Sequence, residues 1–222
     1  MHTYIARSLG AVLCCVALSA AAQSSTEELL SINARFLIAA RNADAAALKR
    51  NLQGGAAVNA RNRLGESALI ILLKKDRVDL AQLVLDAGAD VNQAAVNGLT
   101  PLMAAAFNGQ TEMAKQLLAK GADPSPLDRL QKSAMTYAAG EGRTEIVTML
   151  LAKGVNANAA YNNDLTALMW AAGFGKTDTV KALLAAGANP ALKDNRGKTA
   201  ADIAREQGFA ETVAALGAPM GK

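Results

Sequence analysis

Residues 100–123, TPLMAAAFNGQTEMAKQLLAKGAD, contain the pattern that decides the fold, because its features return along the chain every 33 residues. A helix-opening Ser or Thr recurs at this step without one insertion or deletion, at Ser67, Thr100, Ser133, Thr166 and Thr199. Two glycine series keep the same step: Gly55, Gly88, Gly121, Gly154 and Gly187, and Gly109, Gly142, Gly175 and Gly208. A fixed period of this length predicts a stacked array of repeated units and not a closed globule.

The recurring polar residues and glycines predict where each helix begins and ends. A Ser or Thr hydroxyl caps the first helical turn by accepting a hydrogen bond from a free backbone N–H, and losing one such cap costs about 1 kcal/mol. The Gly109 series should close the first helix of each unit and the Gly55 series the second. Asp76 stands where the Gly109 series requires glycine, so we expect strain in that turn.

Small and large residues alternate between the two helices of a unit. The first helices carry alanine pairs at 39–40, 105–106, 138–139 and 171–172, with Leu72-Leu73 as an exception. The second helices carry larger pairs at 84–85, 117–118, 150–151 and 183–184. Stacked wedges of this kind predict a curved array with a concave face lined by the short helices and the turn tips.

The sequence resembles the ankyrin-repeat family, whose unit is a β-turn plus two antiparallel helices with a T-P-L-H-x-A helix start. Thr100-Pro101-Leu102-Met103-Ala104-Ala105 is the best copy of that start. The resemblance implies an all-α repeat solenoid of about six ankyrin repeats, each a helix-turn-helix with a β-turn or hairpin tip. We place this domain at 23–218, with repeats starting near 30, 63, 96, 129, 162 and 195, and a short tail at 219–222.

Both ends of this domain should act as caps. Ser25 and Glu28 fit a capping box ahead of the first helix. In the last repeat, Asp202 and Arg205 replace apolar or small residues, which is tolerable where no further repeat packs.

Residues 1–22 have the parts of a secretory signal peptide. Arg7 precedes an uncharged run from Leu9 to Ala22, which ends in three alanines and is shorter than the ~20 residues of a membrane-spanning helix. We therefore expect cleavage after Ala22 and a periplasmic protein, with secretion as the alternative destination. An uncleaved anchor and lipid attachment at Cys14 or Cys15 are further alternatives. The chain contains no Asn-x-Ser/Thr acceptor, which favours a bacterial periplasm over a eukaryotic secretory route.

Removal of residues 1–22 would leave a chain without His or Cys, because His2, Cys14 and Cys15 all lie in that segment. This composition excludes disulfides, the usual zinc sites and most nucleophilic constellations, so the sequence predicts no enzyme, no metal and no cofactor. The remaining chain would have 22 basic and 19 acidic residues, a net charge of +3, without a basic run or nucleic-acid motif. We therefore expect neither a nucleic-acid partner nor stable membrane insertion.

Ankyrin proteins in general bind partners through turn tips and the exposed end of the first helix. The 33-residue phase carries these positions onto twelve candidate partner-binding residues: Arg63, Leu64, Lys74, Lys75, Val96, Leu99, Phe107, Arg129, Leu130, Lys132, Leu165 and Phe174.

Six of these positions are apolar and should see solvent in the central repeats: Val96, Leu99, Phe107, Leu130, Leu165 and Phe174. A contiguous exposed apolar group indicates an interaction site, and aromatic residues are enriched at energetic hot spots. Basic residues flank the group at Arg63, Lys74, Lys75, Arg129, Lys132, Arg196 and Lys198. In the alternative interpretation, Leu99 and Leu165 fold back into the repeat junction and the lysines are ordinary solvated residues. Tyr137 and Trp170 share one repeat position and are expected to be core or half-buried.

These features favour a monomeric, non-enzymatic periplasmic module that binds an apolar and acidic surface of another exported protein, in an accessory, protective or inhibitory role. An immunity protein against a delivered toxin is an alternative in the same class. A hydrolase working with carboxylates alone is a second class, although the repeating Glu112, Glu145, Asp178 and Glu211 are explained by the helix dipole. A structural or membrane-surface protein is a third.

Overall fold

The computed structural model of the protein describes residues 31–217, and these residues form paired α-helices. The first helices of the pairs are α2 (Ile32–Asn42), α4 (Ala68–Lys74), α6 (Pro101–Asn108), α8 (Ala134–Glu141), α10 (Ala167–Gly173) and α12 (Ala200–Glu206). The second helices are α3 (Ala45–Gln53), α5 (Val78–Asp86), α7 (Thr111–Ala119), α9 (Thr144–Ala152), α11 (Thr177–Ala185) and α13 (Ala210–Ala215). The predicted signal peptide, the capping box at Ser25 and Glu28, and the tail at 219–222 lie outside the described residues.

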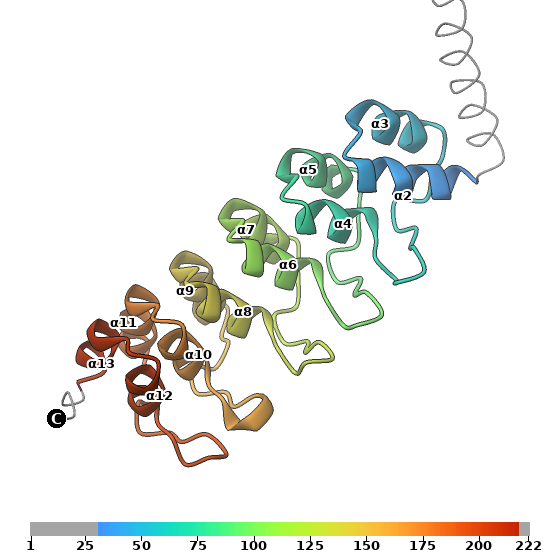
Figure 1. The fold of residues 1–222 in the computed structure, drawn as a ribbon. Helices are drawn as coiled ribbons and strands as arrows, with labels where there is room; N and C mark the ends of the chain where they lie inside the picture. Colours follow the sequence, from blue (N-terminus) through green and yellow to red (C-terminus); the bar gives the residue numbers. More distant parts are fainter. Residues whose placement is uncertain (1–30, 218–222) are drawn as a thin grey trace, which may run out of the picture.

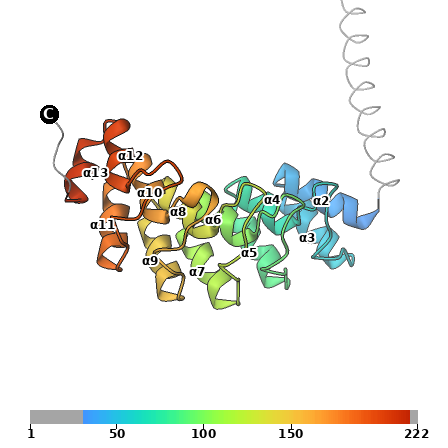
Figure 2. The same cartoon turned by 90° about the horizontal axis from the view of Figure 1, so that it is seen from below.

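The helix pairs stack side by side in an elongated array (Figures 1 and 2). The first helices contact one another in one layer, from α2 through α12, and the second helices form the other layer. A loop after each second helix projects to one side before the next pair begins. We call the first helices the inner helices, the second the outer helices, and the face carrying the inner helices and the loops the inner face. The helical repeat solenoid expected from the sequence is confirmed.

The inner helices begin where the 33-residue series predicted. The hydroxyls of Thr100, Ser133 and Thr166 each accept a hydrogen bond from the backbone N–H three residues later. Ser67 and Thr199 do the same at the starts of α4 and α12. The first pair departs from the series, because Ser31 caps α2 and that helix is several residues longer than the other inner helices.

One continuous apolar core runs through the stack. The alanine pairs of the inner helices are buried, as are most large residues of the outer helices, and together they belong to one cluster that runs from Phe36 to Val213. Leu72 and Leu73, the exception to the alanine rule, are also fully buried. Each helix pair exposes apolar surface on both sides, so its neighbours are needed to cover it.

The ends of the helices also follow the sequence. The Gly55 series has φ between +86° and +90°. Asp76 has a φ of +56°, so the predicted left-handed, strained conformation is confirmed, and its Oδ1 accepts a hydrogen bond of 2.8 Å from Gln110 of the next repeat. At the far end of the array, Asp202 and Arg205 form an ion pair of 2.9 Å on α12.

An asparagine ladder ties successive repeats together, and sequence reasoning missed it. Asn59, Asn92 and Asn158 each accept, through Oδ1, a hydrogen bond from a backbone N–H 31 residues later. The amide nitrogens of Asn92 and Asn158 also donate to the carbonyls of Gly121 and Gly187. These asparagines lie on the same 33-residue step as the caps, with Ser125 interrupting the series, so their spacing was a usable signal.

Substitutions at two glycines test how closely neighbouring hairpins pack. An added Cβ at Gly121, with φ of +86°, meets no atom within 4 Å, whereas at Gly98, with φ of +83°, it lies 2.8 Å from the Cα of Asp128 in the next hairpin. We expect Gly121→Ala to lower the free energy of unfolding by about 1–2 kcal/mol, the conformational penalty alone. Gly98→Ala should lower it further, because the next hairpin must move. Urea unfolding measures both, and equal losses would contradict the described contact between hairpins.

Candidate functional site

Each loop between an outer helix and the next inner helix contains a hairpin, and we number the hairpins by the repeat to which they belong: second (62–66), third (95–99), fourth (128–132), fifth (161–165) and sixth (194–198). The tip of each hairpin bonds to at least one neighbouring tip. The backbone N–H of Val96 donates to the carbonyl of Leu64 at 2.8 Å, and that of Arg129 donates to the carbonyl of Asn97 at 2.8 Å. The N–H of Asn195 donates to the carbonyl of Asn163 at 3.0 Å. These bonds recur on the 33-residue step, so the tips form a ladder along one edge of the inner face.

A buried or half-buried side chain holds most hairpins closed from within. Asn62, Asp128 and Asp194 occupy equivalent positions, and one side-chain oxygen of each accepts two backbone N–H groups of its own hairpin. The fifth hairpin has Tyr161 at this position and forms a short 3-10 turn, η1 (Asn162–Asp164), in which Asn163 and Asp164 have φ of +60° and +57°. Its tip therefore has a different shape from the others.

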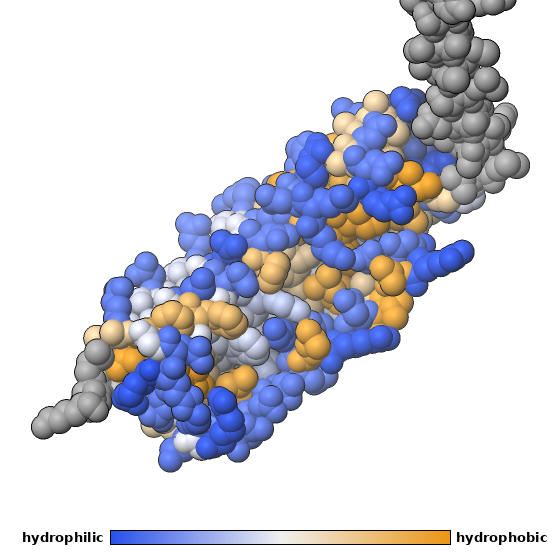
Figure 3. Space-filling model, viewed as in Figure 1, coloured by the Kyte–Doolittle hydropathy of each residue, from blue (hydrophilic) through white to orange (hydrophobic). Residues whose placement is uncertain are grey.

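The structure leaves most of the predicted apolar site residues exposed. Leu64, Val96, Phe107, Leu130 and Phe174 have between 47% and 64% of their surface accessible. Leu99 and Leu165 are half-buried against the core, so the prediction that they would see solvent is wrong for these two. They directly precede the buried caps Thr100 and Thr166, where the chain turns into the stack. In Figure 3, orange apolar side chains lie between polar ones over the inner helices and hairpins.

The basic flank predicted from the sequence is partly neutralised. Lys74 forms an ion pair of 2.5 Å with Glu66, and Lys198 pairs with Glu206. Arg196 binds the buried Asp194 at 2.6 Å. Among residues 31–217, the predicted site residues Arg63, Lys75 and Arg129 are exposed and make no ion pair. Acids of the same repeats thus neutralise part of the predicted basic flank.

An aromatic cluster joins three inner helices at the centre of this face. Phe107 of α6 meets Tyr137 of α8 edge to face, with ring centroids 5.8 Å apart. Trp170 stacks on Phe174 with centroids 6.0 Å apart. Tyr137 and Trp170 are half-buried, as expected. Gly140 lies beside the second pair, and a Cβ added there would be in ordinary van der Waals contact with Phe174 at 3.6 Å and Trp170 at 3.7 Å.

Lys132 connects the two aromatic pairs. Its Nζ lies 4.4 Å from the Trp170 ring centroid and 5.4 Å from that of Tyr137, within the range of cation–π attraction. Lys132 belongs to the fourth hairpin and is half-buried, and within the described part of the chain its ammonium makes no ion pair. The cluster thus combines aromatic surface with one positive charge that has no carboxylate partner.

Tyr137 is fixed by the hairpin beneath it. Its hydroxyl donates a hydrogen bond of 2.5 Å to Oδ2 of the buried Asp128, whose other oxygen closes the fourth hairpin. Burial, together with the negative charge and hydrogen bonding of Asp128, raises the pKa of the Tyr137 hydroxyl well above its ordinary value. The aromatic cluster is therefore anchored to the hairpin fold and not only to the helices.

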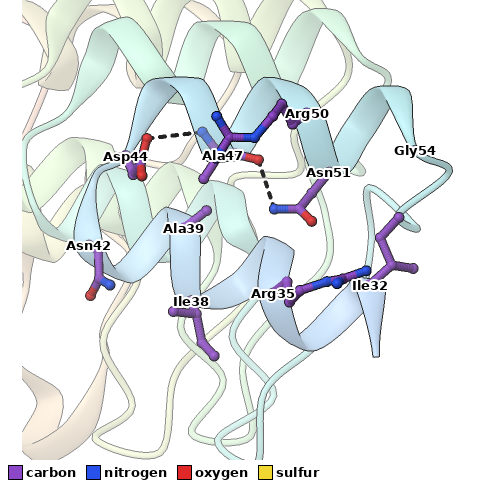
Figure 4. Close-up of a pocket in the computed structure, with 10 residues that line it drawn as sticks. All are labelled: Ile32, Arg35, Ile38, Ala39, Asn42, Asp44, Ala47, Arg50, Asn51 and Gly54. Atoms are coloured by element: carbon purple, nitrogen blue, oxygen red, sulfur yellow. Dashed lines mark hydrogen bonds between the residues drawn. The ribbon is translucent and has the colours of Figure 1, made fainter. Parts of the chain in front are cut away.

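Two hollows have different surroundings. One of about 290 Å³ lies between the fourth and fifth hairpins and is lined by Leu130, Gln131, Lys132, Tyr161, Asn162, Asn163, Leu165 and Trp170. The other, of about 360 Å³, lies between α2 and α3 in the first helix pair. Figure 4 shows Arg35 and Ala39 of α2 facing Asn51 and Ala47 of α3. Only the first hollow contains residues predicted as a site, namely Leu130, Lys132 and Leu165.

Three carboxylates gather elsewhere, around a polar hollow lined by Glu141, Asp178 and Glu211. Asp178 and Glu211 have 88% and 80% of their side-chain surface accessible and share Lys181 at 3.7 and 4.0 Å. A carboxyl acting as general acid is typically held in an apolar pocket that keeps it protonated. The arrangement gives the carboxylate hydrolase no support.

Within residues 31–217, no three His, Cys, Asp or Glu side chains are grouped so that they could hold a metal ion. In the same range, no helix is both long and apolar enough to cross a bilayer.

A search against protein-family models identifies ankyrin repeats (three copies) over residues 36–128, 97–160 and 134–220. The chain belongs to the ankyrin-repeat family. No curated protein matches the sequence. Ankyrin repeats in general mediate protein–protein interaction, and the family match indicates a protein-binding module without pointing to any enzymatic family.

Sequence reasoning predicted a binding face on the inner helices and hairpin tips, but it missed how the residues of that face join. Phe107 and Phe174 were singled out as separate exposed aromatics, whereas Tyr137 and Trp170 were set aside as packing residues. The structure brings all four together with Lys132. The residue spacing gave no direct signal, because Phe107 and Phe174 occupy different positions of the repeat and meet different partners.

The Tyr137–Asp128 contact predicts how stability depends on pH. Folding raises the pKa of Tyr137 above its ordinary value of 10.0, so the stabilisation is complete below about pH 10 and is lost as the pH rises further. We expect Tyr137→Phe to lower the free energy of unfolding at neutral pH by about 1 kcal/mol and to remove part of the alkaline loss. Urea unfolding between neutral pH and pH 11 measures both. Tyr161→Phe is the control and should keep the alkaline loss. An unchanged alkaline slope in Tyr137→Phe would contradict the assignment.

Proposed function

We propose that this ankyrin-repeat protein is exported to the periplasm and acts there as a non-enzymatic module that binds another exported protein. Its role is to recruit, protect or inhibit that protein. The observation that carries the proposal is the aromatic cluster of Phe107, Tyr137, Trp170 and Phe174 on the inner face. The packing of one repeat on the next does not require so many aromatic side chains there. Phe107 and Phe174 are about half exposed and add nothing to the buried core.

The inner face has the composition of a protein-binding surface. Large apolar residues at its centre are exposed and lie on rigid helices and bonded hairpins, so little ordering is required when a partner binds. Aromatic side chains on such a surface are the residues that most often supply binding energy. The apolar residues of neighbouring repeats, Val96 and Leu130, extend the surface along the hairpin tips.

The positive charges on the inner face indicate which groups the proposed partner presents. Lys132 at the centre, with Arg63, Lys75 and Arg129 at the margin, gives positive charge that no described carboxylate neutralises. The matching partner presents an apolar ridge with carboxylates beside it. Charges at the margin steer association more than they strengthen the complex.

The proposed destination rests on residues 1–22, which combine a basic start, a short apolar run and an alanine exit. The protein is proposed to work as a monomer, with secretion as the alternative destination. An immunity protein against a delivered toxin uses the same kind of surface as an accessory factor, so the two roles are separated by whether a toxin or an envelope enzyme is encoded next to this chain.

Phe107→Ser combined with Phe174→Ser tests the binding face. We expect this double variant to lose capture of the partner from envelope extract, while far-UV circular dichroism and thermal unfolding stay nearly unchanged, because both rings are about half exposed and lie outside the buried core. The matched control is Lys120→Ser with Lys153→Ser, two exposed residues at the ends of outer helices, and it should keep full capture. Capture that survives the phenylalanine substitutions would show that the inner face is not the site.

Cell fractionation and N-terminal sequencing test export. We expect the protein in the periplasmic fraction, beginning at Gln23, because cleavage after Ala22 follows the alanine exit. Replacing Leu13 and Val16 with Asp should leave the uncleaved protein in the cytoplasm, since charge disrupts the apolar run. A wild-type protein that remains uncleaved in the cytoplasm would refute the proposed location.

A further inference from the structure

The ladder of hairpin tips is interrupted at one junction. Tip bonds join the second hairpin to the third, the third to the fourth, and the fifth to the sixth. The corresponding pair between the fourth and fifth hairpins is the carbonyl of Leu130 and the N–H of Asn162, and within residues 31–217 this pair makes no backbone hydrogen bond. One acceptor and one donor of the ladder are therefore left for another partner.

The cause lies in the tip of the fifth hairpin. Asn163 has a φ of +60° there, in addition to Asp164 at +57°, whereas Gly98 and Gly197 alone are left-handed in the third and sixth hairpins. The lack of a side-chain acceptor inside a hairpin does not by itself break the ladder. The third hairpin has Ala95 at the position of Tyr161 and still bonds to the tips on both sides. The second left-handed residue, Asn163, is what distinguishes the fifth hairpin.

A hollow lies at this interrupted junction. Its volume of about 290 Å³ is at the lower limit of ligand pockets in general, so it fits one large side chain better than a whole small molecule. The lining is apolar at Leu130, Leu165 and Trp170, and it includes Asn162, one end of the open backbone pair. An apolar side chain and a backbone segment can thus be accommodated together.

The charge in the lining of the hollow is positive. Lys132 is the charged residue among those that line it, and its ammonium rests on the Trp170 ring. Asp164 stands at the adjacent tip and Asp128 lies beneath, but Asp128 is buried and already bonded to Tyr137. An arriving carboxylate can therefore pair with Lys132 without displacing an existing ion pair.

We propose that the junction of the fourth and fifth hairpins binds an extended peptide segment of the partner protein. The segment bridges the open pair through its backbone, places one aliphatic or aromatic side chain in the hollow against Trp170, and presents a neighbouring carboxylate to Lys132. This is strand addition to an exposed backbone edge, in which the backbone bonds supply affinity and the hollow supplies specificity. The inference rests on the proposed protein-binding function and identifies the part of the partner that is recognised.

A synthetic hexapeptide, acetyl-Gly-Ser-Leu-Glu-Ser-Gly-amide, is the probe. Trp170 is the only tryptophan of the chain, so its fluorescence reports occupation of the hollow, and the ¹⁵N amide signal of Asn162 reports the backbone contact. We expect saturable changes in both signals. Serine in place of the leucine should weaken binding about tenfold, lysine in place of the glutamate about threefold, and N-methylation of the leucine about tenfold.

A variant that closes the junction tests the geometry directly. Tyr161→Asp, Asn163→Arg and Asp164→Gly together copy Asp194, Arg196 and Gly197 of the sixth hairpin, remove the asparagine that is left-handed only in the fifth tip, and should restore the bond between Leu130 and Asn162. We expect it to fold at least as stably as the wild type and to lose peptide binding about tenfold or more. Ala95→Asp is the matched control, because it adds the same acceptor to the third hairpin, away from the hollow, and should bind the peptide normally.

The outcomes separate this inference from the proposed function. No saturable change in Trp170 or Asn162, or equal binding of the leucine and serine peptides, overturns the peptide site. Partner capture that persists in the closed-junction variant but disappears with the two phenylalanine substitutions also overturns it, while leaving the protein-binding function intact. Loss of capture in both variants, together with peptide binding that depends on leucine and glutamate, supports both.

Discussion

Burial of apolar surface between successive helix pairs is the interaction on which the rest of the structure depends. A single pair leaves an apolar face uncovered on each side, and only a neighbour in the same register can cover it. The strict 33-residue step keeps that register from Ser67 to Thr199, and the core runs without a break from Phe36 to Val213. Caps, left-handed glycines and the asparagine ladder then fix the ends of helices that are too short to be stable alone.

Some large residues of the inner face have no role in holding the stack together. The stack needs the alanines of the inner helices and the large residues of the outer helices, whereas positions such as Phe107 and Phe174 are not needed to fill the core. Side chains at these positions are supported by rigid elements on both sides. Tyr137 is an example. Its ring packs against Phe107, and its hydroxyl donates a hydrogen bond to Asp128, which also accepts the backbone hydrogen bonds that close the fourth hairpin. A perturbation of the hairpin would therefore reach the aromatic surface directly.

Much of the fold and part of the candidate site followed from the residues. The starts of the inner helices, the left-handed turn at Asp76 and the exposure of Phe107, Leu130 and Phe174 were predicted because each depends on one position of a regular repeat. The half-burial of Leu99 and Leu165 was only the alternative interpretation, since it depends on how tightly the chain turns into the cap that follows. The ion pair of Lys74 with Glu66 was not predicted, because the fold has to bring the end of α4 close to the second hairpin before the two side chains can meet.

The sequence by itself determined a register, because a fixed period with caps and glycines at constant phase allows only a stacked array. It also determined which residues the stack does not require. The tertiary structure decided what those residues do together. Contacts between different repeats formed the aromatic cluster around Lys132, and the backbone conformation of Asn163 interrupted the ladder of tips. The physical reason is that a periodic sequence specifies each repeat alike, whereas the aromatic cluster and the open junction arise where side chains and backbone of unlike repeats meet in space.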